Sequence, residues 1–355
     1  MPTLTQRILQ SECDGGILGK RFTSYYIMVF VMHLALKRTT LLVLSGLLIG
    51  MYLLPVTAQD AGGTTMPTPV AQATPTPIPR PQPATVLTQD KATLEVYFTS
   101  LAQGSTGLLH VTGTGIAGAK SSFLDDLVDF FPMPNDGFYG LVSASMEQTA
   151  RNYTLDVLVW YEDGTRETIS TKVDVTVGAF IKQVVTLPPD KSYLADPEIE
   201  RNEFAKLESI MSATTPQRMW DSSGFQLPIP GGELTSPFGA FRNYNGIMDT
   251  RHTGWDIRAT LGQPVMASAA GKVVYTGLMD IRGNIVVVDH GMGVFSTYNH
   301  FSQTHVTRGQ TVNAGQVLGV VGNTGRTTGP HFHWEIVVNG NFVDPVQFIQ
   351  MWKPG

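Results

Sequence analysis

The sequence predicts a mostly β protein in which two β-rich parts are joined by one short helix. In the first part, short runs alternate apolar and polar residues, as at Leu94, Val96 and Phe98, which is the period of a half-buried strand. In the second part, runs of β-branched residues are separated by glycines, and helix signals are sparse. The chain of 355 residues, 42% of them hydrophobic, is long enough for two domains with extensions.

The N-terminus has the composition of an export signal. A basic pair precedes the apolar run 41–54, and Val56 and Ala58 are small residues suited to a cleavage point after Ala58. The apolar run is short for a membrane span, which needs about 20 residues. An uncleaved anchor, helped by the apolar residues 25–36, is the alternative. Cleavage would also remove Cys13, the single cysteine, which suits an oxidising compartment.

A proline-rich spacer, residues 59–87, follows the signal. Proline occupies every second position in residues 74–83, where it removes amide donors and fixes φ, so the chain there is expected to be extended. Residues 88–190 then show several short alternating runs with a turn signal at 162–165. This pattern predicts a β-sandwich of immunoglobulin type, in which no cluster of chemically active residues occurs.

Residues 191–224 are expected to form a connecting helix and a linker. Asp196 is a suitable N-cap, Pro197 favours the first helical position, and Phe204 and Leu207 begin one apolar stripe. We expect this helix to end near Ser212 and to pack between the two domains. From residue 225 onward the glycine-separated runs predict a largely antiparallel β domain.

Residues with metal and proton chemistry lie in three short clusters of this last domain: His252-Thr-Gly-Trp-Asp256, Tyr298-Asn-His300 and Gly329-Pro-His331-Phe-His333. Imidazole and carboxylate are the ligands of zinc sites that keep a position open for water. His331 and His333 are two apart on an expected strand and would therefore point to one face. Zinc lowers the pKa of a bound water to about 7, and a further histidine can serve as general base or stabilise the oxyanion.

The remaining features indicate no second site. His110 and His305 are interpreted as core or surface residues, and His290 as a turn residue that bonds to the backbone. The net charge of −5 and the lack of a basic run argue against nucleic-acid binding.

At the three clusters the chain resembles the M23 family of zinc metallopeptidases, the lysostaphin-type or LytM-type peptidoglycan endopeptidases. The resemblance covers residues 227–348. Besides the clusters it includes Leu234-Thr-Ser-Pro-Phe-Gly239, Gly262-Gln-Pro-Val-Met-Ala267, Gly283-Asn284, Gly322-Asn-Thr-Gly325 and Val343-Asp-Pro345. Phe301 and Phe332 stand where the family commonly has leucine, and both remain apolar. The upstream sandwich and helix resemble the N-terminal region of exported M23 proteins more loosely.

The resemblance implies that His252, Asp256 and His333 bind one Zn²⁺ per chain and that His300 and His331 are catalytic. It implies a groove-bearing antiparallel sheet and hydrolysis of peptidoglycan cross-links by metal-activated water. The protein would be exported to the periplasm, the cell envelope or the medium, and would meet the membrane only through its signal or anchor.

Two other functions stay open. A latent or non-catalytic M23-like envelope protein would bind the cell wall or activate amidases, with the groove blocked by the sandwich or by the loop 241–250. A purely structural envelope protein is the second. The expected division is signal or anchor 1–58, spacer 59–87, immunoglobulin-like sandwich 88–190, connecting helix and linker 191–224, and M23 domain 225–355. We expect residues from 222 onward to fold and act alone.

Overall fold

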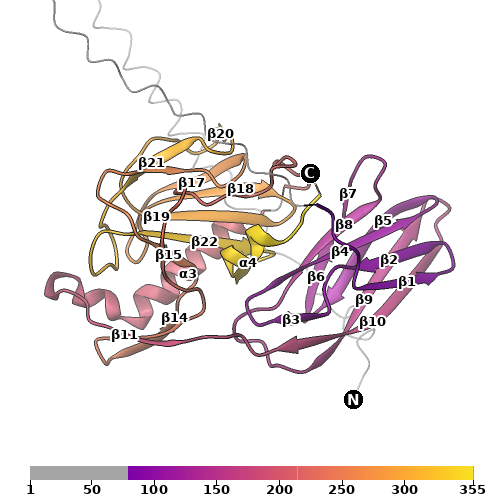
Figure 1. Cartoon of the computed structure of the whole chain (residues 1–355), viewed down its shortest axis with the longest axis horizontal. Coiled ribbons are helices and arrows are strands. Elements are labelled where there is room, and N and C mark those ends of the chain that lie inside the picture. The colour runs from indigo at the N-terminus through magenta and orange to yellow at the C-terminus, as the bar shows by residue number, and fades with distance from the viewer. Residues whose placement is uncertain (1–78, 214, 355) are drawn as a thin grey trace, which may run out of the picture. The chain divides into compact units, whose positions relative to one another are not determined.

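The computed structural model describes residues 79–213 and 215–354 (Figure 1). The expected signal or anchor, 1–58, and most of the spacer, 59–87, lie outside the described residues. Of the described residues, 47% are in strands and 10% in helices, which confirms the mostly β prediction. Within the described ranges, no helix has both the length and the apolar character needed to cross a membrane.

The first part consists of two five-stranded sheets that enclose one core. The sheet orders are β1-β2-β4-β8-β7 and β3-β10-β9-β5-β6. Leu94 and Val111 of the first sheet share a buried cluster with Val157 and Ile169 of the second, so the sheets form a sandwich. Its immunoglobulin type stays a prediction. The strands are β1 Thr85–Gln89, β2 Ala92–Val96, β3 Ser100–Ala102, β4 Thr106–Gly113, β5 Ile116–Phe123, β6 Asp126–Asp129, β7 Phe131–Pro132, β8 Phe138–Ser143, β9 Asn152–Tyr161 and β10 Arg166–Thr176.

The connection between the two parts begins earlier than the expected residue 191. Strand β11 (Lys182–Val185) lies within the residues 88–190 expected to form the sandwich, but it pairs with β13 instead. A 3-10 helix (Pro189–Ala195) and helix α3 (Pro197–Met211) follow. Asp196 caps α3 as predicted, because its side chain accepts a hydrogen bond from the Glu198 N–H.

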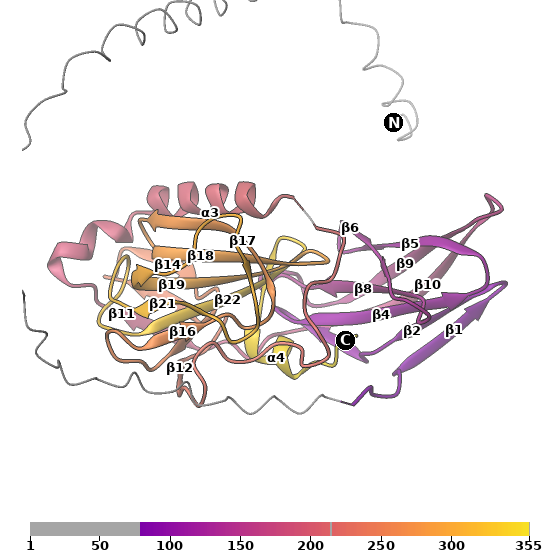
Figure 2. The same cartoon turned by 90° about the horizontal axis from the view of Figure 1, so that it is seen from above.

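Helix α3 does not pack between the two parts as expected. Its apolar stripe, with Phe204 and Leu207, packs on Ile285, Val287 and Phe295 of the large sheet, and the helix runs along that sheet in Figure 2. The reason is that these strands are apolar on both faces, so a second layer is needed to cover the outer face of the sheet.

The second part is built on a ten-stranded antiparallel sheet. Its main path is β12-β15-β22-β19-β18-β17-β20, with β16, β21 and β23 attached at the sides. Hairpin β13–β14 forms a separate three-stranded sheet with β11. The elements are β12 Leu234–Ser236, β13 Phe241–Tyr244, β14 Met248–Arg251, β15 Trp255–Ile257, β16 Pro264–Met266, β17 Gly271–Met279, β18 Gly283–Gly291, β19 Val294–Thr304, β20 Thr311–Val312, β21 Val317–Val321, β22 Phe332–Val338, β23 Asn341–Val343 and α4 Pro345–Gln350. The predicted antiparallel character is confirmed.

Candidate metal centre and active site

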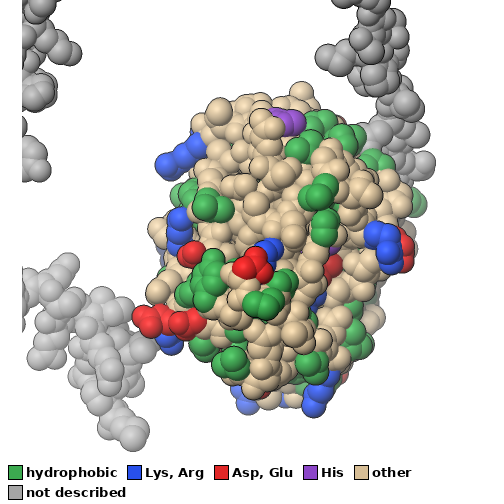
Figure 3. Space-filling view, turned by 90° about the vertical axis from the view of Figure 1, so that its left-hand side faces the viewer, with side chains coloured by type: hydrophobic (Ala, Val, Ile, Leu, Met, Phe, Trp, Pro, Cys, Tyr) green, Lys and Arg blue, Asp and Glu red, His purple; other side chains and the backbone are tan. Residues whose placement is uncertain are grey.

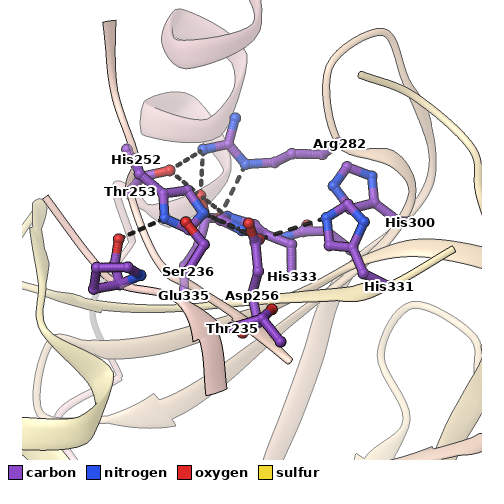
Figure 4. A network of polar contacts seen from close by, with 12 residues as sticks. Thr235, Ser236, His252, Thr253, Asp256, Arg282, His300, His331, His333 and Glu335 are labelled. Carbon is purple, nitrogen blue, oxygen red and sulfur yellow. Dashed lines mark hydrogen bonds and ion pairs between the residues drawn. The ribbon is translucent and has the colours of Figure 1, made fainter. Parts of the chain in front are cut away.

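The large sheet brings His252, Asp256 and His333 to one point (Figure 4). Pairing of β15 with β22 sets Asp256 opposite His333, and His252 follows the end of β14. Asp256 Oδ1 lies 3.1 Å from His252 Nε2 and 2.9 Å from His333 Nδ1. These two nitrogens are 3.0 Å apart. All three side chains are buried, so their donor atoms face one another rather than solvent.

The outward nitrogens of the two imidazoles are already engaged. His252 Nδ1 lies 2.7 Å from the Pro237 carbonyl oxygen, and His333 Nε2 lies 3.2 Å from Glu335 Oε1. A carbonyl and a carboxylate can only accept, so we assign the proton to these outward nitrogens. The inward nitrogens then present lone pairs to the shared point. Metal-binding histidines commonly have such outer partners, so the donor set fits a metal ion.

The electrostatics favour the metal-binding protonation state at two of the three residues, His252 and Asp256. Burial lowers the pKa of His252 to about 4, despite the nearby Asp256 carboxylate. Burial alone would raise the pKa of Asp256, but the charges of His252 and Arg242 hold it well below its usual range. Burial also opposes a charge on His333, yet its hydrogen bonds to Asp256 and Glu335 raise its pKa. Neutral imidazole at His252 and a carboxylate at Asp256 are therefore the forms present at neutral pH.

His300 and His331 lie beside this cluster, with ring centroids 4.9 Å apart. Their Nδ1 atoms are 2.8 Å from the Thr324 carbonyl and 2.9 Å from the Gly329 carbonyl, which leaves each Nε2 as a lone-pair acceptor. His331 Nε2 lies 3.5 Å from Asp256 Oδ1. Burial holds the pKa of His300 well below its usual value, whereas 21% of the His331 side chain is exposed. All five predicted site residues therefore lie together.

The other three histidines in the described part of the chain belong to the core or the surface. His110 is buried and bonded to Glu95 and to the Asp136 carbonyl, as expected for a satisfied core residue, and His305 is exposed. His290 bonds to the Ala270 carbonyl, as predicted. The prediction of a turn was wrong, because His290 is fully buried within β18.

A buried charge network below the cluster was not predicted. Glu335, which is 0% exposed, accepts hydrogen bonds from Arg282 Nη2 at 2.6 Å and from Arg282 Nε at 2.9 Å. Arg282 Nη1 also donates to Glu203 Oε1 of α3 at 3.0 Å. Glu335 could have been predicted, because it follows His331 and His333 at the same spacing of two residues. Nothing local in the sequence links Arg282 or Glu203 to the site.

Arg242 is a second contact that was not predicted. It lies on β13, in the segment expected to be a loop, which is instead the hairpin β13–β14. Its Nη2 lies 2.5 Å from Asp256 Oδ2, while its Nε donates to Gln183 Oε1 of β11 at 3.0 Å. One oxygen of the Asp256 carboxylate therefore faces the histidines, and the other faces an arginine held by the connecting segment.

A cavity of about 350 Å³ gives access to the cluster. Its lining includes Asp256, His300 and His331 of the site and Gln183, Val184, Val185 and Leu187 of the connecting segment. The arrangement offers a metal-binding point with two lone-pair imidazoles beside it, open to a space large enough for part of a peptide.

Comparisons with known proteins agree with this geometry. Residues 250–345 match the profile of peptidase family M23. The DD-carboxypeptidase/endopeptidase Mpg of Neisseria meningitidis is 41% identical over 128 residues, which are 36% of this chain and 29% of that protein. The peptidoglycan DD-endopeptidase ShyA of Vibrio cholerae is 43% identical over 96 residues, 27% of this chain and 22% of that protein. The chain thus spans less than a third of the length of these curated relatives.

A solved structure extends the similarity upstream. The crystal structure of a protein described as a peptidase M23 from Pseudomonas aeruginosa superposes with a TM-score of 0.53 at 27% identity. The match covers 70% of this chain and 95% of that one. The superposed part of this chain is longer than the 96 residues of the family match and the residues that follow it, so the fold similarity includes residues before 250.

Proposed function

The chain carries a domain of peptidase family M23, and from this premise we propose that it is a zinc metalloendopeptidase that hydrolyses the peptide cross-links of peptidoglycan. The observation that carries the proposal is the convergence of His252 Nε2, Asp256 Oδ1 and His333 Nδ1, which lie 2.9–3.1 Å from one another. The names of Mpg and of ShyA support the substrate class.

We assign one Zn²⁺ to His252, Asp256 and His333. When bound, the ion would polarise the scissile carbonyl and lower the pKa of the attacking water. His331, whose side chain is partly exposed, is suited to take the proton from that water at Nε2 and to pass it to the leaving amine. His300 is kept neutral by burial, so its Nε2 would accept a hydrogen bond from the water and orient it.

The place of action follows from the substrate. We propose that the protein works in the cell envelope or periplasm or outside the cell, where its substrate lies, and that residues 1–58 direct its export. The division into two domains is retained as part of the proposal, but the expected bounds 88–190 and 225–355 both change. Because β11 and α3 contact the site and its sheet, the sandwich is proposed to end after β10 and the catalytic unit to begin near residue 181.

The rival function is a latent or non-catalytic envelope protein. It would require a closed groove or an incomplete site. The cavity of about 350 Å³ beside His331 and the presence of all five site residues favour the enzyme. Arg242 and Tyr244 of the hairpin, with Gln183, Val184 and Val185 of β11, line this cavity.

Digestion of purified sacculi by the exported chain tests the proposal. We expect mass analysis to show stem peptides freed from their cross-links, with one water added for each peptide bond hydrolysed. A chelator should stop release, and one equivalent of Zn²⁺ should restore it. Zinc-loaded, folded protein that releases no peptide would contradict the proposal and favour the non-catalytic alternative.

A further inference from the structure

Strand β11 belongs to the connection between the two parts and lies outside the family-matched residues, yet it is fixed beside the site. Gln183 Oε1 accepts hydrogen bonds from Arg242 Nε and from Ser236 Oγ, both at 3.0 Å. Just after the strand, Leu187 packs into a buried cluster with Tyr244 and Met248 of the hairpin. The strand is therefore held at a set position relative to Asp256, which the same Arg242 contacts.

One edge of β11 has no strand beside it. In the part of the chain that the structure describes, β11 ends the sheet β11-β13-β14. Its pairing with β13 is parallel, and the ladder includes Phe241 N–H to Ile181 O at 2.8 Å and Asn245 N–H to Val185 O at 3.0 Å.

The free edge presents the backbone of Val184. In a parallel ladder, alternate residues direct their N–H and C=O groups to the same neighbour. Ile181 and Val185 bond to β13, so Val184 directs its N–H and C=O away from it. Among the described residues, no hydrogen bond engages either group of Val184. Its side chain is 81% exposed.

This edge faces the catalytic cavity. Gln183 and Val185 line the cavity together with Arg242 and Tyr244, their partners on β13, so the cavity covers this face of the β11–β13 ladder. Val184 points its side chain to the other face but also lines the cavity, so the cavity reaches the free edge of β11. Asp256, His300 and His331 line the same cavity. An extended peptide with its scissile bond at the cluster would pass beside β11.

We propose that the free edge of β11 is a docking strand for the substrate, and that the bound stem peptide exchanges backbone hydrogen bonds with Val184. The proposal rests on the proposed function for the identity of the peptide. Main-chain pairing at a sheet edge gives affinity, and side-chain pockets add specificity. The end of the molecule that includes β11 carries hydrophobic side chains among charged ones in Figure 3, so the exposed Val184 side chain can add apolar contact.

Proline scanning of the full exported chain tests the docking strand. Val184→Pro removes the N–H that points away from β13, so all hydrogen bonds between β11 and β13 remain. An edge strand tolerates proline at such a position. With a soluble cross-linked muropeptide we expect KM to rise about 3- to 10-fold, the cost of one hydrogen bond, with zinc content unchanged. Lys182→Ala changes an exposed neighbour and keeps every backbone N–H of β11, so it should retain the wild-type KM. An unchanged KM in Val184→Pro would overturn the proposal.

Amide hydrogen exchange gives an answer even if Val184→Pro fails to fold. In the metal-free wild-type chain, which cannot turn over, the Val184 amide should exchange fast and become protected by saturating muropeptide. The Gln183 amide, already bonded to β13, should be protected throughout. Saturation without protection of Val184 would reject the docking strand. The two proposals can also be told apart. If the peptide protects the Val184 amide but the zinc-loaded chain does not cleave that peptide, the proposed function is rejected and the docking strand is kept.

Discussion

Glu335 Oε1 lies 3.2 Å from His333 Nε2, on the side of the imidazole away from Asp256. The same carboxylate is held by Arg282 on two hydrogen bonds, so its position is fixed by a buried ion pair. A carboxylate so placed orients the imidazole and increases its basicity toward a metal. We therefore expect the metal affinity of the site to depend on Glu335, although Glu335 is not among the proposed ligands.

Neutralising this carboxylate should weaken metal binding. We expect Glu335→Gln to lower zinc affinity by about 10- to 100-fold, because the His333 imidazole loses its anionic acceptor. Competition with a chromogenic chelator measures the affinity, and near-UV circular dichroism checks that the variant is folded. Glu233→Gln is the matched control, since Glu233 forms an exposed ion pair with Arg258. A folded Glu335→Gln protein with wild-type affinity would show that Glu335 only balances the charge of Arg282.

The five site residues should separate into two classes. His333→Ala should abolish zinc binding and hydrolysis together, since a ligand is lost. His300→Ala and His331→Ala should keep most of the zinc but lower kcat by about 100-fold or more, as expected for lost proton transfer or orientation. Zinc content by elemental analysis and rates on one muropeptide distinguish the classes. If His331→Ala releases zinc as completely as His333→Ala, the division between ligand and catalytic histidines is wrong.

Acid should destabilise the fold through a histidine remote from the metal site. Burial lowers the pKa of His290 to about 4, against an ordinary value of 6.5. Between these two values the unfolded chain binds a proton that the folded chain does not, so unfolding is favoured as the pH falls. The contribution is fully present above pH 6.5 and is lost toward pH 4, by about 3 kcal/mol at most.

Urea unfolding of the metal-free protein from pH 7.5 to 4 measures this contribution. His290→Gln should be less stable at pH 7.5, because Ser296 and the Ala270 carbonyl lose a partner, but its stability should fall less steeply with acid. His305→Gln, at an exposed position, should keep the wild-type slope. Equal slopes in all three proteins would mean that His290 is protonated in the folded state.

Local sequence patterns predicted the metal site but not the residues that support it. Four of the five site residues occur in local pairs, His252 with Asp256 and His331 with His333. Imidazole and carboxylate are also residue types that bind metals, so local sequence was sufficient to find them. The start of α3 was also predictable, because Asp196 caps it through a bond to a residue two positions away.

The supporting residues come from distant segments. Glu203 meets Arg282 across 79 positions, and Gln183 meets Arg242 across 59. Such contacts exist only once the helix has packed on the sheet and the connecting segment has paired with the hairpin. For the same reason α3 was expected between the domains, since a stripe of apolar residues does not say which surface it covers.

These long-range contacts alter the expectation that residues from 222 onward fold and act alone. Removing α3 would expose the sheet face under Phe204 and Leu207. It would also leave Arg282 without Glu203 and Arg326 without Glu200, two buried ion pairs. Breaking one buried pair by removing a partner costs about 3–5 kcal/mol, a large part of the stability of an ordinary domain.

Two truncations test where the catalytic unit begins. We expect a chain starting at residue 222 to be largely unfolded or aggregated, and one starting at residue 178, which keeps β11 and α3, to be more stable and to bind zinc. Thermal unfolding and zinc titration compare them with the exported chain. The longer fragment still loses the sandwich, whose Thr106 exchanges two hydrogen bonds with Gln347 of α4, so its melting temperature should stay below that of the whole chain. A chain from 222 that is folded, zinc-loaded and active on small muropeptides would show that neither α3 nor β11 is needed, and the proposed boundary near residue 181 would have to be abandoned.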